Sequence, residues 1–261
     1  MTLAEKVALV TGAGSGVGRG IALAMGAAGA RIALNYPPGD QAGAEETARL
    51  LQGQGTPCLL VEADVSDREQ VQAMVERIDA DWARLDVLVN NAAVQLNRSL
   101  LEYAPADLDW VIDVNVGGYF WCTQAVLPLM KAQGGGRIIH IASVHAKRPS
   151  DFDPVYAMTK ASVIMLTRES ALALGPYHIT VNAITPGAIQ IEQPKFALRV
   201  RPDLVRPSVT SRVEPRRVNR MILGRAGQPR DVGDLAVFLA SEGSQWMTGS
   251  VLRLDGGSML G

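Results

Sequence analysis

Cysteine and histidine are scarce in this chain of 261 residues, which has two cysteines and three histidines. Cys58 and Cys122 lie far apart in apolar stretches and form no CxxC pair. This pattern argues against a structural metal site, and it fits a reducing compartment, in which disulfides rarely form. We expect both thiols to be buried and inert.

Net charge is nearly absent as well, because 25 basic residues face 26 acidic ones and leave a formal charge of -1. Such a balance gives no electrostatic reason to expect a nucleic-acid partner. The chain has no apolar run of membrane-spanning length, and its start, MTLAEKVALVTG, lacks the basic region and apolar core of a signal peptide. We therefore expect a cytoplasmic protein that binds neither nucleic acid nor membrane.

Short apolar runs rich in β-branched residues are plentiful, and they alternate with longer stretches of helical spacing. Seven runs are predicted as strands: VALVTG, RIALNY, PCLLVEAD, LDVLVNNA, RIIHIAS, ITVNAITPG and SVLRLDGG. The helices predicted between them span Val17–Ala28, Ala44–Gln52, Arg68–Trp82, Leu108–Met130, Tyr156–Leu174 and Asp231–Ala240. Strands that are apolar throughout are covered on both faces of a parallel sheet. The sequence thus predicts one α/β domain over residues 1–261, a doubly wound parallel sheet of about seven strands with helices on both faces.

One long segment departs from this alternation. Residues 187–225 carry nine basic side chains against three acidic ones. Long segments between a strand and the next helix of a compact domain often form lids or binding loops. The segment is therefore either a lid that selects a charged substrate or a basic loop exposed to solvent, and the sequence leaves both interpretations open.

The stretch VALVTGAGSGVGRGIALAM predicts a strand, a tight glycine turn and a helix. Gly12, Gly16 and Gly18 allow a sharp bend and a close approach of a ligand, while the helix that begins near Val17 offers unpaired N–H groups to a pyrophosphate. The spacing differs from GxGxxG, which would place a glycine at position 17. It indicates a dinucleotide site, although such turns also occur for packing alone.

The end of the second predicted strand bears on the choice of dinucleotide. An acid there usually binds the ribose hydroxyls of NAD, but RIALNY ends in Asn35 and Tyr36, and the next acid is Asp40. This absence permits NADP and favours it slightly over NAD. No arginine directly follows Tyr36 to demand it.

Tyr156 and Lys160 are four residues apart on a predicted helix and so share a face. A nearby ammonium favours the phenolate and lowers the pKa of a phenol. By themselves the two residues more often indicate an amphipathic helix with a lysine that extends to solvent. Ser143 ends a predicted strand, where parallel sheets bind ligands, and Asn115 is an amide in an apolar helical run. Its amide either bonds backbone at a local kink or orders a water.

Together these motifs resemble the classical short-chain dehydrogenase/reductase family over nearly the whole chain. They appear in order as TGAGSGVG, ADV, NNAA, Asn115, Ser143, YAMTK, NAITPG and LDGG. The resemblance implies a Rossmann-type fold, a homotetramer and a catalytic tetrad of Asn115, Ser143, Tyr156 and Lys160. Tyr156 would act as acid and base, Ser143 would position the substrate oxygen, and Lys160 would lower the pKa of the tyrosine and bind the nicotinamide ribose. Asn115 would hold a water of a proton relay.

The same resemblance implies a cofactor site for NAD or NADP. Its residues would be Gly12, Ser15, Gly16, Val17, Gly18, Tyr36, Asp64, Val65, Asn91, Ala92, Lys160, Pro186, Gly187 and Ile189. Relatives usually carry a threonine after the PG turn that bonds the carboxamide, and Ile191 stands in its place. Backbone contacts to the carboxamide are expected instead.

Short segments, NY, VIDVN, SVH and PGAI, further resemble bacterial glucose 1-dehydrogenases. The substrate would then contact Ser143, His145 and Tyr156, although His145 is equally a solvated loop residue. The predicted function is an NAD(P)-dependent oxidoreductase for a secondary alcohol or carbonyl of a small molecule, with a sugar first and a 3-oxoacyl or other small-ketone reductase as the alternative. A regulator that senses a dinucleotide without catalysis is the alternative from another class, and the presence of Tyr156 and Lys160 argues against it. His140, inside a predicted strand, is expected to be a satisfied core residue.

Overall fold

A computed structural model describes residues 1–150, 153–191 and 221–260. Its centre is a sheet of seven parallel strands in the order β3-β2-β1-β4-β5-β6-β7. The strands are β1 (Val7–Val10), β2 (Arg31–Tyr36), β3 (Cys58–Glu62), β4 (Val87–Asn90), β5 (Gly136–Ile141), β6 (Ile179–Pro186) and β7 (Val251–Leu254). All seven predicted strands are confirmed, and so is the α/β fold class.

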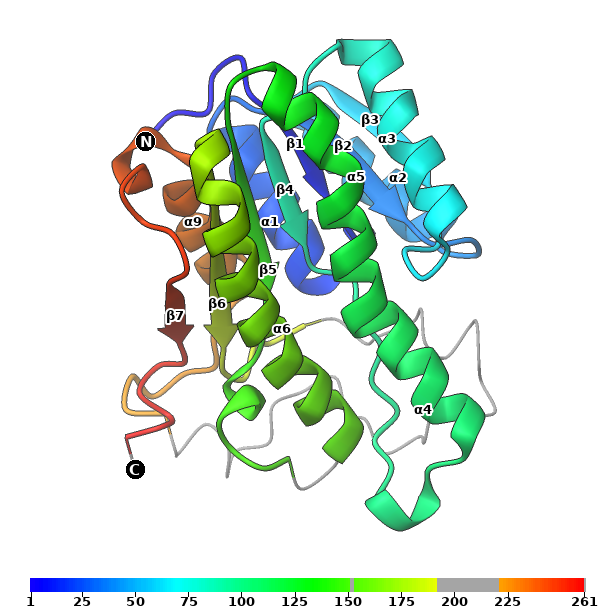
Figure 1. Cartoon of the computed structure of the whole chain (residues 1–261). Helices are drawn as coiled ribbons and strands as arrows, with labels where there is room; N and C mark the ends of the chain where they lie inside the picture. The colour runs from blue at the N-terminus through cyan, green and yellow to red at the C-terminus, as the bar shows by residue number, and fades with distance from the viewer. Residues whose placement is uncertain (151–152, 192–220, 261) are drawn as a thin grey trace.

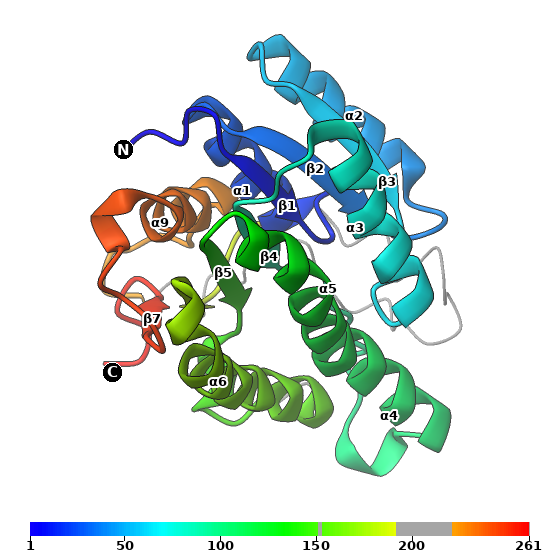
Figure 2. The same ribbon diagram turned by 45° about the horizontal axis from the view of Figure 1, so that its top comes forward.

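Helices cover both faces of this sheet (Figures 1 and 2). One layer holds α1 (Gly16–Ala27), α2 (Gln41–Gly53) and α9 (Pro229–Ala240). The other holds α3 (Arg68–Trp82), α5 (Gly118–Ala132) and α6 (Pro154–Leu174). The five central strands are mostly buried between the layers because their apolar side chains point alternately to the two faces, whereas the edge strands β3 and β7 are mostly half-buried.

The helix predicted over Leu108–Met130 is longer and less regular than expected. It consists of α4 (Pro105–Ile112), a π-helical turn (Asp113–Gly117) and α5. A π turn widens a helix locally and is frequent at functional sites. Here it carries Asn115.

The two cysteines differ in burial: Cys122 is buried, whereas Cys58 is half-buried. Burial raises the pKa of Cys58 to about 11 and that of Cys122 to about 12, so both remain thiols at neutral pH, as expected of inert residues. Within the described ranges, no helix combines the length and apolar character needed to cross a membrane.

The predicted lid lies mostly outside the described residues. Eight of its nine basic side chains fall in 192–220. The ninth, Arg225, forms two hydrogen bonds of 2.7 and 3.0 Å to the carboxylate of Asp231 at the start of α9. This arginine therefore helps to anchor the end of the segment to α9.

Candidate active site

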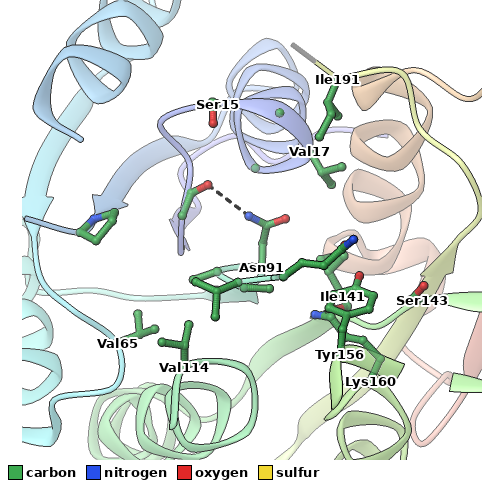
Figure 3. Close-up of a pocket in the computed structure, with 18 of the residues that line it drawn as sticks. Ser15, Val17, Val65, Asn91, Val114, Ile141, Ser143, Tyr156, Lys160 and Ile191 are labelled. Carbon is green, nitrogen blue, oxygen red and sulfur yellow. Dashed lines mark hydrogen bonds between the residues drawn. The ribbon is translucent and has the colours of Figure 1, made fainter. Parts of the chain in front are cut away.

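A cleft of about 510 Å³ runs along the carboxyl ends of β1, β4, β5 and β6 (Figure 3). Strands β1 and β4 are neighbours at the point where the strand order reverses, which is where open α/β sheets bind ligands. Most of the predicted site residues line it: Gly12, Ser15, Gly16, Val17, Gly18, Asp64, Val65, Asn91, Ala92, Ser143, Tyr156, Lys160, Pro186, Gly187 and Ile189. The chain thus brings together residues that are far apart in sequence.

The glycine turn at one end of the cleft is held by two asparagines. Asn35 Oδ1 accepts the N–H of Gly12 at 3.2 Å, and Asn91 Nδ2 donates to the carbonyls of Thr11 and Gly12 at 2.9 and 3.2 Å. Gly12 has φ +62°, which favours glycine, and a Cβ on Gly18 would collide with the carbonyl of Gly12. The turn is therefore rigid, and it directs the N-terminus of α1 into the cleft.

A dinucleotide fits this cradle. The first turn of α1 carries no acidic residue, so its N–H groups and positive dipole end suit a pyrophosphate. Asp64 and Val65 form a side wall, and Asp64 is held by hydrogen bonds of 2.9 and 2.7 Å from the N–H and hydroxyl of Ser66. The cleft then continues to Ser143, Tyr156 and Lys160, where the reactive end would lie.

Tyr36 does not line the cleft. Side chains alternate along a strand, and Ile32, Leu34 and Tyr36 all pack into the apolar layer that includes α1 and α2. Asn35, on the other face, lines the cleft instead. The assignment of Tyr36 to the cofactor site stays a prediction, and the residue of this strand end that lines the cleft is its neighbour Asn35.

Asp40 also lines the cleft and is 6% exposed. Its carboxylate lies against the glycine turn, since a Cβ built on Gly14 would be 2.6 Å from Asp40 Oδ2. The sequence has no acid at the end of β2, but the fold brings Asp40, which follows later in the chain, to the same side of the cleft.

Tyr156 lies in the first turn of α6, and its ring centroid is 5.6 Å from the ammonium nitrogen of Lys160. Figure 3 shows Tyr156, Lys160 and Ser143 at the same end of the cleft. Burial raises the pKa of Tyr156 to about 12, although its hydrogen bond with Ser143 acts in the opposite direction. Burial also lowers the pKa of Lys160 to about 7. Burial therefore outweighs the hydrogen bond with Ser143, and the lowering of the tyrosine pKa by Lys160 stays a prediction.

Asn115 is fully buried next to the cleft and does not line it. Its Oδ1 accepts the N–H of Val94 at 2.7 Å, and its Nδ2 donates to the carbonyl of Val94 at 2.9 Å and to Thr159 Oγ1 at 3.2 Å. These bonds fit the first of the two interpretations, bonding to backbone, and a role of Asn115 in a proton relay stays a prediction. Asn115 fastens the segment after β4 to α6.

Two side chains that the motifs do not reveal support this end of the cleft. Asp153, fully buried, accepts the N–H of Leu96 at 2.8 Å and that of Tyr156 at 3.0 Å. Tyr119 lies beside Lys160, and its hydroxyl accepts a hydrogen bond of 3.0 Å from the ammonium. A sequence signal exists for Asp153, since an Asp directly before Pro154 is typical of a helix N-cap. None exists for Tyr119.

The two histidines near the site differ in environment. His140 is buried, bonded to Thr167 Oγ1 at 3.0 Å and to Thr123 Oγ1 at 3.4 Å, and burial lowers its pKa to about 3. It is the satisfied core residue that we expected. His145 lies in a short 3₁₀ turn after Ser143, and its side chain does not line the cleft.

Comparisons with known proteins agree with this geometry. The family model described as Enoyl-(Acyl carrier protein) reductase matches residues 12–259. The chain is 33% identical to the 3-oxoacyl-[acyl-carrier-protein] reductase FabG of Staphylococcus aureus, over 97% of each chain. It is 37% identical to the oxidoreductase UcpA of Salmonella typhimurium, over 99% of this chain and 96% of that one.

Solved structures agree as well. A short-chain type dehydrogenase/reductase from Mycobacterium marinum superimposes with a TM-score of 0.86 at 31% identity, covering all of this chain and 97% of that one. The acetoin dehydrogenase YohF from Salmonella typhimurium does so with a TM-score of 0.84 at 34% identity and the same coverage.

Proposed function

This chain belongs to the short-chain dehydrogenase/reductase family of oxidoreductases, and we propose that it transfers hydride between NAD and a small molecule with a ketone or secondary alcohol. The observation that carries the proposal is the group of Ser143, Tyr156 and Lys160 at the far end of a cleft that begins at a glycine turn. When bound, the nicotinamide supplies or accepts the hydride. The chain's own residues hold the substrate oxygen and move its proton.

In this proposal Ser143 donates a hydrogen bond to the substrate oxygen, and Tyr156 exchanges the proton. A phenol whose pKa is about 12 is fully protonated near neutral pH and so is ready to donate to the oxygen of a ketone. Lys160 stabilises the phenolate that remains, when its ammonium is charged. A protonated Tyr156 thus suits the role of proton donor to a ketone.

For the cofactor we propose NAD over NADP, although the end of β2 by itself favours NADP slightly. The support is Asp40, whose carboxylate lies in the wall beside the glycine turn. A carboxylate there can accept hydrogen bonds from ribose hydroxyls, and it would repel a 2′-phosphate. Arg19 lies at the same turn, where its guanidinium donates to the carbonyl of Gly14 at 2.7 Å and to Thr47 Oγ1 at 2.9 Å.

For the substrate we propose a small ketone, such as a hydroxyketone or a 3-oxoacyl thioester. Trp110 offers an apolar surface in the cleft, and His145, the candidate sugar contact, lies outside the lining. Sugar oxidation is the second candidate, and it is favoured by two amides in the same wall, Gln95 and Asn97. Because Gln95 donates to Asn97, part of their hydrogen-bonding capacity is already used.

The test is the absorbance of the reduced nicotinamide at neutral pH. Purified protein is mixed with NADH or NADPH and acetoin or the acetoacetyl thioester of N-acetylcysteamine, and separately with NAD or NADP and D-glucose. We expect NADH to be oxidised by a ketone. Turnover of glucose alone would contradict the ketone assignment, and cofactor binding without turnover of any substrate would favour the dinucleotide-sensing regulator.

Replacement of Tyr156 by Phe tests the proposed acid. We expect kcat to fall by at least ~100-fold, because the proton donor is lost, while the Kd of NADH changes little. Steady-state kinetics and the fluorescence of bound NADH measure the two effects. Tyr177→Phe is the matched control, because Tyr177 is 44% exposed and lies outside the cleft. A Tyr156→Phe enzyme with undiminished kcat would rule out this role.

A further inference from the structure

Tyr119 is a buried residue of α5 whose hydroxyl lies between two groups of the site. It is 1% exposed, donates to the carbonyl of Ile141 at 2.8 Å and accepts from Lys160 Nζ at 3.0 Å. Lys160 Nζ also donates to the carbonyl of Ile141 at 2.8 Å. The hydroxyl, the ammonium and the carbonyl thus form a closed triangle at the end of β5.

This triangle accounts for two of the three N–H groups of the ammonium. Lys160 is 2% exposed yet lines the cleft, so the third N–H is available to groups on the cleft side. The position of Nζ is therefore set by α5 and β5, and not only by the helix that carries the lysine. We propose that Tyr119 is a positioning residue that holds the Lys160 ammonium in place and stabilises its charged form.

A phenol suits this role because one hydroxyl accepts from the lysine and donates to a carbonyl at the same time. Burial raises the pKa of Tyr119 well above its ordinary value, so the hydroxyl keeps its proton. Tyr119 does not line the cleft, so it does not replace Tyr156 as the acid. The ring is fixed as well, since it lies 5.6 Å from the ring of His140, which Thr123 and Thr167 hold by hydrogen bonds. A rigid partner of this kind limits where the ammonium can move.

Removing this hydroxyl has a defined effect on protonation. The buried ammonium loses an acceptor, so the pKa of Lys160, which burial already lowers to about 7, decreases further. At a given pH fewer molecules then carry the charge that stabilises the Tyr156 phenolate. The loss of activity is therefore greatest at high pH, and lowering the pH partly restores activity.

The test variant is Tyr119→Phe, which keeps the ring and removes only the hydroxyl. Because the kinetic readout rests on the proposed function, a readout that needs no turnover accompanies it. Lysine labelled with ¹³C at Cε reports the pKa of Lys160 by NMR, and the signal is assigned by its loss in Lys160→Met. Melting temperature checks folding, Tyr177→Phe is the matched control, and Tyr119→Met replaces the Phe variant if that does not fold.

We expect the pKa of Lys160 and the alkaline limb of the kcat profile to move down by about one pH unit, and kcat at pH 8 to fall about tenfold. An unchanged Lys160 pKa in a folded variant would overturn the proposal, even if the melting temperature dropped. A lowered pKa in a protein that reduces no ketone would support the role of Tyr119 and contradict the proposed function.

Discussion

Asp40 is the residue by which the cofactor preference can be tested. Asp40→Asn keeps the shape of the side chain but removes the charge from the wall beside Gly14. We expect the ratio of kcat/KM for NADPH to that for NADH to rise about 10- to 100-fold, because repulsion of the 2′-phosphate is lost. Asp79→Asn, which removes a charge from an exposed site on α3, should leave the ratio unchanged. If this ratio were unchanged in Asp40→Asn, residues other than Asp40 would determine the cofactor preference.

The side chains that could be predicted at this site are those with a local signature. Tyr156 and Lys160 share a helix face, and Ser143 directly follows a strand, so each is recognisable from its neighbours in sequence. Tyr119 and Asn35 gain their roles only from contacts across the fold, such as the one from Tyr119 to Lys160 over 41 positions. Nothing in the residues around Tyr119 indicates that its hydroxyl meets an ammonium, so sequence reasoning could not find it.

The start of α6 depends on a single carboxylate. Asp153 caps this helix through the N–H of Tyr156, and it also accepts the N–H groups of Leu96 and Asn97 at 2.8 and 3.2 Å and the hydroxyl of Tyr103 at 2.5 Å. It thereby joins the segment after β4 to the helix that carries the candidate acid. Because it is fully buried, its loss leaves several donors without an acceptor.

We therefore expect Asp153→Ala to lower the free energy of unfolding by about 2 to 4 kcal/mol and to reduce kcat as well. Urea unfolding and kinetics measure the two effects. Asp67→Ala is the matched control, because Asp67 caps α3 through the N–H groups of Glu69 and Gln70 at an exposed position. It should lower the free energy of unfolding less than Asp153→Ala does and leave kcat unchanged. If the two variants had equal effects on stability and on kcat, Asp153 would act only as a helix cap.

Helices and strands were predictable where periodicity alone decides them. The predicted Arg68–Trp82 helix matches α3 at both ends, and the other confirmed helices differ by a few residues at their caps. The π turn at Asp113–Gly117 could not be predicted, because the apolar spacing of this stretch is compatible with one regular helix. The departure from a regular helix occurs at Asn115, whose side-chain amide forms hydrogen bonds with the backbone of Val94.

The molecule as a whole exposes an apolar stripe that bears on its assembly. Met158, Met165 and Leu172 repeat every seven residues along α6 and are 49, 52 and 76% exposed. Side chains at this spacing lie on one face of a helix, and a stripe of this kind commonly packs against another helix. The other face of α6 is buried against the sheet, so the stripe is available to a second copy of the chain. The homotetramer implied by the family resemblance stays a prediction, and this stripe supports it.

Met165→Glu tests that assembly by placing a charge in the centre of the stripe. Sedimentation velocity should show the unaltered protein at the mass of four 27.8 kDa chains, and the variant at a smaller mass, because burying an unpaired carboxylate at a helix contact is costly. Ala73→Glu adds the same charge at an exposed position on α3 and should remain a tetramer. A monomeric unaltered protein would refute the tetramer. If the Met165→Glu protein were still a tetramer, the contacts between its copies would lie away from α6. The helix that carries Tyr156 and Lys160, the candidate catalytic residues, would then receive no support from a neighbouring copy.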